Sequence, residues 1–261
     1  WVGPKIENYY MLASAPSIYR PVMKQFALGG NGPVYGSSTQ PGFGAAWTQT
    51  NDDPTAARFA VSAAYTAQNG ENSTADQGIF GTDAKSATLI KVEYGSPRWQ
   101  VSLATAFKND GWADTYFATS DAGTRAAGAS ETAIGLRAYW KPEEVGVVPA
   151  IQFGYDTTQV DGNGTDVKEA NGWMVGLGWK DVIVDGNTAG VALGSRMNAT
   201  AYGAGSSETE GATDTFSWEA YYTFKINDNV SITPAVFAND DPNTGTNDDS
   251  SGYVVLTQFK F

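Results

Sequence analysis

The stretch Phe216-Ser-Trp-Glu-Ala-Tyr-Tyr-Thr-Phe-Lys-Ile226 alternates between an apolar and a more polar set of side chains. Successive side chains of a β-strand point to opposite faces, so this pattern predicts a strand with one apolar face. Asn227-Asp228-Asn229 then favours a tight turn, and Val230 to Ala238 repeats the alternation in the returning direction. Pro234 has no N–H for the ladder, so we expect a local bulge or a gap in pairing there. The stretch therefore predicts a β-hairpin.

The same period of two returns in about twelve segments along the 261 residues. Near the start, Val2 and Ile6 stand on the apolar side and oppose Lys5. In a later segment, Met197 shares the apolar side with Val191. Gly, Ala, Ser, Thr and charged residues fill most of the other parity, whereas a solid barrel or a sandwich core would fill its inward face with large aliphatic residues. The pattern predicts a sheet with one face toward lipid and one toward water.

The connections between these segments alternate in length, which is typical of an up-and-down membrane barrel with short periplasmic turns and long outer loops. A sandwich with Greek-key crossovers would not keep this alternation. The short connections are near 51–53, 96–98, 141–146, 181–187 and 227–229, and the long ones are 13–41, 69–85, 109–130, 158–171, 201–214 and 239–251. The sequence predicts one all-β domain over residues 1–261, a transmembrane antiparallel β-barrel.

Aromatic residues gather at both ends of the predicted strands, on the apolar parity. The ends near short turns carry Trp47, Tyr94, Trp99, Trp140, Trp179, Phe224 and Phe261, and the ends near long loops carry Tyr65, Phe107, Tyr155, Trp173, Trp218 and Tyr253. Two such bands on one face are the interfacial girdles of a membrane barrel. The alternative is ordinary cross-strand aromatic pairing in a soluble sheet, which does not require both bands.

Composition excludes several classes of function. A net charge of -12 argues against nucleic-acid binding, and the absence of His and Cys removes Ser-His-Asp and Cys-His catalysis and His-based zinc sites. A glycosidase with two carboxylates remains formally open, but Glu143-Glu144 in a short turn offers no cleft. The Asp- and Asn-rich run 239–249 could hold Ca²⁺, although loop solvation explains it better. We expect no enzyme, no cofactor and no resident metal.

The final segment ends on a terminal aromatic residue behind alternating apolar residues, which resembles the C-terminal assembly signal of outer-membrane barrels. Tyr253, Val255, Phe259 and Phe261 carry that signal. Together with Ile226-Asn-Asp-Asn-Val-Ser-Ile-Thr-Pro-Ala-Val-Phe237, this end resembles cyanobacterial carbohydrate-selective (OprB-type) porins, which are also catalogued as iron uptake porins. Trp1-Val-Gly-Pro-Lys-Ile6, Met11-Leu-Ala-Ser-Ala-Pro-Ser-Ile-Tyr19, Phe26-Ala-Leu-Gly-Gly30 and Gly42-Phe-Gly-Ala-Ala46 look like a segment in that family's first half.

The resemblance implies a barrel of about sixteen strands in the outer membrane of a Gram-negative cell, with lipid and lipopolysaccharide around it. It also implies a homotrimer, and a preceding domain that binds peptidoglycan. Three or four leading strands would then lie ahead of this chain, so the twelve visible strands would not close a barrel alone. The family's solutes include sugars, inorganic ions and iron.

The predicted function is passive diffusion of small hydrophilic solutes, tuned by charges that line the lumen. The pore-lining candidates on the polar parity are Lys5, Glu7, Arg58, Lys91, Glu93, Lys108, Arg137, Lys180, Arg196, Glu219 and Lys225, with Lys260 beside them. This set is mostly basic and the long loops are mostly acidic, so we expect an acidic mouth over a partly basic throat. Alternatively, Lys180, Lys225 and Lys260 sit at the periplasmic rim, solvated by headgroups and water.

The longest loop, 13–41, is a candidate constriction, because folding a long loop into the pore is a general porin device. Tyr19, Arg20, Lys24 and Phe26 are its candidate residues, and the alternative is an outer loop in solvent or at a subunit contact. A structural barrel or surface receptor that anchors envelope layers is the competing function. It predicts a plugged lumen with bulky apolar residues on the polar parity.

Overall fold

The computed structural model describes the chain except for residues 7–16, 31–32, 36–39, 69, 75, 77, 113–124, 145, 207–215 and 241–249. Two short 3-10 helices, η1 (Lys24–Gly29) and η2 (Pro33–Tyr35), accompany twelve strands. The strands are β1 (Val2–Ile6), β2 (Gln40–Thr48), β3 (Arg58–Ala67), β4 (Ser86–Ser96), β5 (Trp99–Asn109), β6 (Ser130–Trp140), β7 (Ala150–Asp161), β8 (Val167–Lys180), β9 (Thr188–Tyr202), β10 (Phe216–Lys225), β11 (Val230–Asn239) and β12 (Ser250–Phe259). The prediction of an all-β chain with about twelve strands is confirmed.

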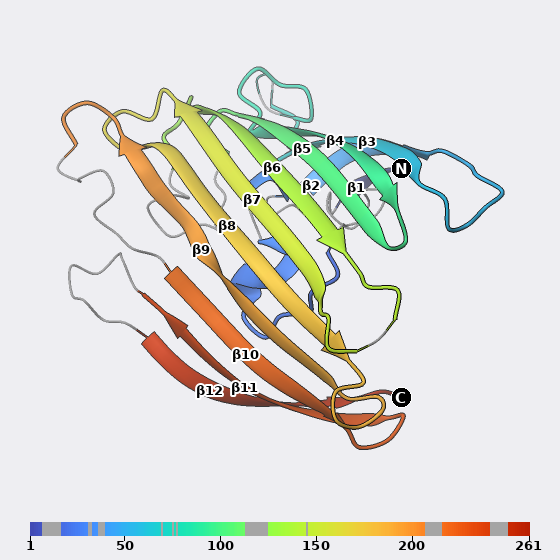
Figure 1. Cartoon of the computed structure of the whole chain (residues 1–261). Coiled ribbons are helices and arrows are strands. Elements are labelled where there is room, and N and C mark those ends of the chain that lie inside the picture. The colour runs from blue at the N-terminus through green and yellow to red at the C-terminus, as the bar shows by residue number, and fades with distance from the viewer. Residues whose placement is uncertain are drawn as a thin grey trace.

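The strands form one antiparallel sheet in which each strand pairs with its neighbours in sequence, from β1 to β12 (Figure 1). The short turns lie together at one end of the strands and the long connections at the other, as the alternating connection lengths predict. The expected gap at Pro234 is also present, because the β10–β11 pairing runs from Ser217 to Tyr221 and resumes at Phe224. Sequence-adjacent pairing of this kind is the up-and-down arrangement.

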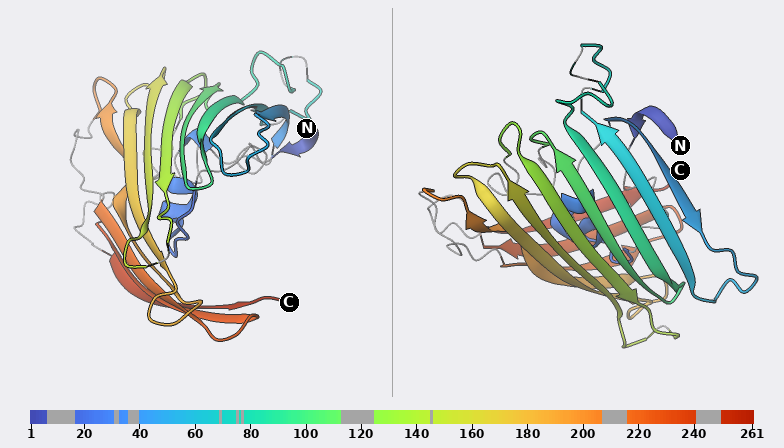
Figure 2. Two further views of the ribbon diagram at one scale, coloured as in Figure 1. Left: turned by 45° about the vertical axis from the view of Figure 1, so that its right-hand side comes forward. Right: turned by 90° about the horizontal axis from the view of Figure 1, so that it is seen from above.

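The sheet curls into an open trough rather than lying flat (Figure 2). β1 and β12 are its two edges. The right-handed twist of neighbouring strands produces such curvature when many strands follow one another. Twelve strands that do not close alone match the expectation from the sequence, and the leading strands that would complete a barrel stay a prediction.

The two faces of the trough differ in exposure and in chemistry. Along β5 on the convex face, Val101, Leu103 and Phe107 are 45, 52 and 44% exposed. On the concave face of the same strand, Ser102 and Lys108 are buried. A folded chain that leaves its large apolar side chains outside and buries its charges is inverted relative to a water-soluble sheet.

Aromatic residues mark both ends of the convex face. At the short-turn end, the rings of Phe59 and Tyr94 lie 4.4 Å apart, and Trp99 is the register partner of Trp140. At the loop end, Phe43 and Tyr65 stack with ring centroids 5.5 Å apart, and Tyr155 pairs with Trp173. From Trp99 to Phe107 is about 27 Å along the strand, or about 20 Å in height at the tilt of membrane strands. That height is close to the apolar band of an outer-membrane barrel.

Two bulges reverse side-chain directions that the alternation predicts. Between Gly3 and Ile6 the β1–β2 register shifts, so Ile6 pairs with Gln40 on the concave parity and is buried while Lys5 is exposed. The prediction that Lys5 lines the pore is therefore wrong. A second bulge in β9, opposite Gly172, turns Met197 to the concave face. A bulge inserts one residue into one strand, so every side chain beyond it changes parity.

Candidate functional site

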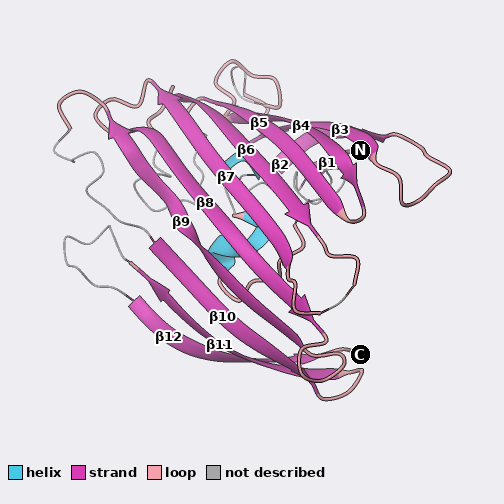
Figure 3. Cartoon of the chain, viewed as in Figure 1, coloured by secondary structure: helices cyan, strands magenta, loops and turns pink. Residues whose placement is uncertain are grey.

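The concave face carries a segment from the β1–β2 connection that lies inside the trough. Residues 17–30 and 33–35, here called the inner segment, contain η1 and η2, which are the only helices in the described part of the chain (Figure 3). η1 lies against β7, β8 and β9, and η2 lies against β5, β6 and β7. The inner segment therefore sits where the constriction hypothesis requires it, and its effect on a passing solute stays a prediction.

Glycines on the concave face make a seat for the inner segment. A Cβ built on Gly135 would lie 2.6 Å from Val34, and one built on Gly176 would lie 2.6 Å from the ring of Tyr19. A Cβ on Gly154 would overlap the carbonyl of Gly29. These three positions on β6, β7 and β8 thus lack side chains because backbone and side chains of the inner segment occupy the space.

Two apolar clusters hold the seated segment. Tyr19 and Phe26 pack with Met174 and Ala192, and Val34 packs with a set of small wall residues around Leu89. The complete second cluster is Val34, Leu89, Ala104, Ala106 and Ala133. Phe26 and Val34 are each only 1% exposed, so the segment buries these side chains against the wall.

Polar wall side chains bind the backbone of the inner segment. Glu219, fully buried on β10, accepts hydrogen bonds from the Tyr19 hydroxyl (2.9 Å) and from the N–H groups of Val22 (3.1 Å) and Met23 (2.5 Å). Burial, and then the negative charge of Glu219, raises the pKa of Tyr19, so its hydroxyl keeps the proton that it donates. This carboxylate fixes the residues on both sides of Arg20.

Three further wall residues complete the anchoring. Gln152 Oε1 accepts from the N–H of Ile18 at 2.8 Å, Arg137 Nε donates to the carbonyl of Leu28 at 2.9 Å, and Lys108 Nζ donates to the carbonyl of Pro33 at 2.7 Å. Hydrogen bonds from charged groups to a buried backbone are the stronger kind. Polar anchors therefore run from residue 18 to residue 33 of the inner segment.

The buried cations of the wall are paired with acids. Lys91 pairs with Glu93, Arg137 Nη2 lies 2.8 Å from Asp156, and Lys108 Nζ lies 3.2 Å from Glu131. Arg125, from the long β5–β6 connection, adds a second cation to Glu131 at 2.6 Å. The partners Glu131, Asp156 and Arg125 are absent from the sequence-based set of lumen residues. The cations in the middle of the wall are thus paired with acids, two of them with Glu131, and the prediction of a partly basic throat did not include these pairs.

The remaining predicted residues lie in several environments. Glu7 is outside the described residues. Tyr19 and Phe26 are buried anchors, whereas Arg20 and Lys24 are exposed on the inner segment. The other pore-lining candidates are Arg58, Lys180 and Lys225, exposed on the concave parity near the short turns, and Arg196, half-buried at the β9 bulge.

The C-terminal strand presents the predicted assembly signal on the convex face. Tyr253, Val255 and Phe259 are 83, 58 and 62% exposed, and the rings of Phe259 and Phe261 are 6.4 Å apart. β12 is an edge strand, so this row is accessible from the side of the sheet as well. Recognition of the row during assembly stays a prediction.

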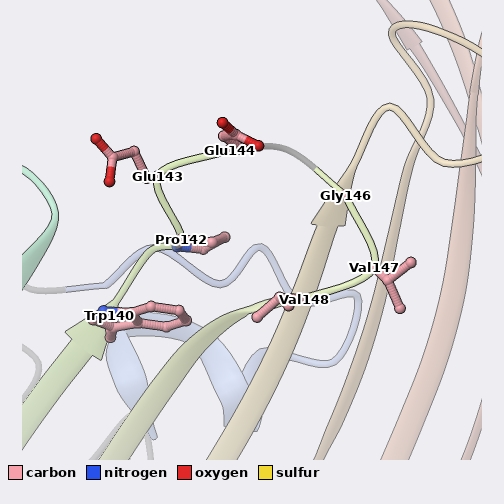
Figure 4. A pocket seen from close by; sticks show the side chains of 7 residues that line it. All are labelled: Trp140, Pro142, Glu143, Glu144, Gly146, Val147 and Val148. Atoms are coloured by element: carbon pink, nitrogen blue, oxygen red, sulfur yellow. The ribbon is translucent and has the colours of Figure 1, made fainter.

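A hollow of about 410 Å³ lies beside the β6–β7 turn, lined by Trp140, Pro142, Glu143, Glu144, Gly146, Val147 and Val148 (Figure 4). The expectation of no cleft at Glu143-Glu144 is therefore wrong. In Figure 4 the two carboxylates stand at the tip of the loop and point away from Trp140. Glu143 pairs with Arg98 at 3.1 Å, and both side chains are largely exposed.

Within the described ranges, no three acidic, His or Cys residues come together in a way that could hold a metal ion. The helices in the same ranges are too short or too polar to cross a membrane.

The chain is similar in sequence to two cyanobacterial proteins. It is 24% identical over 212 residues to "Uncharacterized protein alr4550" of Nostoc sp. (strain PCC 7120), a match that covers 76% of this chain and 35% of the relative. It is 34% identical over 90 residues to "Uncharacterized protein sll0772" of Synechocystis sp. (strain PCC 6803), covering 34% of this chain and 16% of the relative. The chain spans about a third of the length of the first relative. No family model and no solved structure matches it.

Proposed function

We propose that the chain forms the wall of an outer-membrane porin, a passive channel for small hydrophilic solutes and inorganic ions. The observation that carries the proposal is the inverted sheet, with exposed apolar side chains between two aromatic bands outside and paired charges inside. A bilayer makes such an outer face favourable, and backbone groups at membrane depth require a closed barrel. The proposal gives the chain no catalytic role.

The location and assembly follow from the same reading. The resemblance to cyanobacterial carbohydrate-selective and iron uptake porins supports an outer-membrane location, and the cyanobacterial sources of both relatives are consistent with a Gram-negative cell. Lipids and lipopolysaccharide would surround the convex face. Further strands would join β1 and β12, three copies would assemble, and a separate domain would bind peptidoglycan. Sugars and iron are among the solutes that the resemblance suggests.

The inner segment is the proposed constriction of this channel. The wall cations Lys91, Lys108 and Arg137 are neutralised by neighbouring acids, whereas Arg20 and Lys24 are exposed on the segment. Mobile ions respond to charges that water and solute can reach, and much less to buried pairs. Arg20 and Lys24 would therefore set the ion preference of the constriction.

One observation favours the alternative function, a structural barrel or surface receptor. The inner segment fills the trough over β5 to β10, and its contacts with the wall are partly apolar. If further loops filled the rest of the lumen, the barrel would be plugged. Glycines, alanines and exposed charges on the remaining concave parity support a water-filled path beside the segment.

Planar-bilayer recording of the purified protein, with the reversal potential measured in a KCl gradient, tests the proposal. We expect stable conductance steps that come in threes, and in the double variant Arg20→Ala, Lys24→Ala a larger conductance and a shift toward cations. Unchanged conductance and ion preference in the double variant would remove both residues from the constriction. Protein that migrates as a folded, heat-modifiable barrel but carries no current would overturn the porin and favour the structural role.

A further inference from the structure

The short-turn end of the concave face bears a ring of cations that are separate from the ion pairs in the middle of the wall. All five members lie on the concave parity of their strands. In β3, β6, β8 and β10 this parity holds the buried residues, and in β12 it follows from the pairing with β11. They are Arg58 at the start of β3, Lys141 just after β6, Lys180 at the end of β8, Lys225 at the end of β10 and Lys260 just after β12. Each strand end of this ring is next to a short turn, so the five residues belong to one rim of the trough.

Lys141 joins the ring because the hydrogen bonds between β5 and β6 continue one residue beyond Trp140, the end of β6. The N–H of Lys141 donates to the carbonyl of Arg98 at 2.7 Å, which keeps Lys141 in the alternation of Arg137 and Tyr139. Its Nζ lies 5.0 Å from the centroid of the Tyr139 ring, a concave-face side chain. The same continuation occurs at Lys260, whose N–H donates to the carbonyl of Asn229 at 2.8 Å.

Lys141 and Lys180 form the centre of the ring. They stand two strands apart and two residues out of register, about 12 Å between backbones, with the start of β7 between them. Val148, Pro149 and Ala150 occupy that intervening position and carry no charge. Burial lowers the pKa of Lys141, and the positive charge of Lys180 lowers it further, as expected for two cations that face a common space.

The acids of this end lie in the turns rather than on the concave face. Glu143 pairs with Arg98 at 3.1 Å and Asp228 pairs with Lys225 at 2.7 Å. Asp53 and Asp181 accept hydrogen bonds from their own turns, from Thr55 and Gly186. Lys225 is thus partly compensated. Asp181 follows Lys180 and Glu143 lies two residues beyond Lys141, but among the described residues neither Lys141 nor Lys180 forms an ion pair with an acid.

We propose that Lys141 and Lys180 form a binding site for small oxyanions at the short-turn mouth of the trough, with Arg58 and Lys260 extending it around the rim. This inference rests on the proposed function and deepens it, because it names the solute class and the end of the channel that selects it. Rings of Lys and Arg select anions and phosphate in pores. An oxyanion between the two ammonium groups would offset their mutual repulsion, and the Tyr139 ring lies beside Lys141.

Single-channel recording with inorganic phosphate on one side tests the site. Phosphate added at the short-turn side should block the chloride current of the natural protein at a lower concentration than phosphate added at the loop side. The double variant Lys141→Gln, Lys180→Gln should weaken the short-turn block about fivefold, the effect of two charges about 7 Å from a phosphate of charge about −1.5 in 0.1 M salt. Lys85→Gln with Lys168→Gln makes the same change in net charge at the loop end and should leave the sidedness intact.

A lipid headgroup offers the same phosphate chemistry, and bilayer composition separates the two sources. A free oxyanion site keeps its selectivity when phosphatidylglycerol is added to phosphatidylcholine. Selectivity that depends on phosphatidylglycerol, and loses this dependence in Lys141→Gln, Lys180→Gln, would overturn the solute site. Equal block by phosphate from both sides, in the natural protein and in the double variant, would also overturn it.

A second readout needs no current, so that failure of the site and failure of the porin are distinguishable. Phosphate should slow the reaction of Lys141 and Lys180 with an amine-specific reagent in the folded, detergent-solubilised protein, as followed by mass spectrometry of their peptides. Lys85 serves as the internal control, whose reaction should not change. Protection without conductance would retain the oxyanion site and refute the channel. Conductance without protection would retain the channel and refute the oxyanion site.

Discussion

Glu219 is the residue on which the position of the inner segment most depends, and Glu219→Ala is the change that tests this. The substitution removes one acceptor from the Tyr19 hydroxyl and from the N–H groups of Val22 and Met23. Hydrogen bonds to a charged acceptor contribute about 1.5–3 kcal/mol each, and water can partly replace those of the half-buried N–H groups. Taking the low end for all three bonds, the local opening of the segment should become easier by about 4 kcal/mol.

Hydrogen exchange measured by mass spectrometry reports this opening directly. Since each 1.36 kcal/mol is a factor of ten, about 4 kcal/mol corresponds to roughly a thousandfold faster exchange of the Val22 and Met23 amides. Peptides from β5 and β6 should keep their protection, because the sheet ladder does not involve Glu219. Glu144→Gln, a change in an exposed turn, provides the control. If exchange at Val22 and Met23 stayed slow in a folded Glu219→Ala variant, the segment would be held by other contacts and the reasoning would fail.

Three further outcomes follow from the same geometry. Gly154→Val should displace the inner segment, raising its cleavage by added protease and the channel conductance, whereas Gly178→Val, whose Cβ meets no atom within 4 Å, should change neither. Arg137→Met leaves Asp156 buried without its cation and should lower the free energy of unfolding by about 3–5 kcal/mol, measured by urea titration in lipid vesicles, with Asp156→Asn added to recover part of the loss. Leu103→Lys, in the middle of the convex face, should lower the free energy of unfolding by about 2–4 kcal/mol when folding is measured in lipid vesicles. A change near zero in the vesicles would show that this face is not embedded in lipid.

The strands were predictable because their signal is local. Alternation over ten residues identifies a strand and its two faces without knowledge of any partner, and turn residues such as Asn227-Asp228-Asn229 mark where the chain reverses. The errors at Lys5 and Met197 come from bulges, which add one residue to a strand and reverse every side chain beyond it. A bulge depends on the register with the neighbouring strand, so the alternation within one segment cannot reveal it.

The ion pairs of the wall needed information that single strands do not carry. Lys108 and Glu131 are direct register partners in β5 and β6, but more than twenty residues of connection separate them, so their register could not be derived from a turn type. Parity alone would have put Glu131 and Asp156 on the concave face, and this signal was available in the sequence. Lys141 was missed for a related reason, because its place after the last apolar residue of the segment suggested a turn, while its N–H continues the ladder.

The glycines of the polar parity carry two meanings that only the structure separates. Small residues on that face fit a water-filled lumen, yet Gly135, Gly154 and Gly176 are small because the inner segment rests on them. The concave face is therefore divided between a sector that holds the segment, where charges are buried and paired, and the surface beside it. A solute that passes along the trough would meet the exposed Arg20 and Lys24 of the segment and then the rim at Lys141 and Lys180, but not the neutralised cations between them. Selectivity in such a channel would depend on two exposed groups in series, which is why the recordings distinguish variants of the segment from variants of the rim.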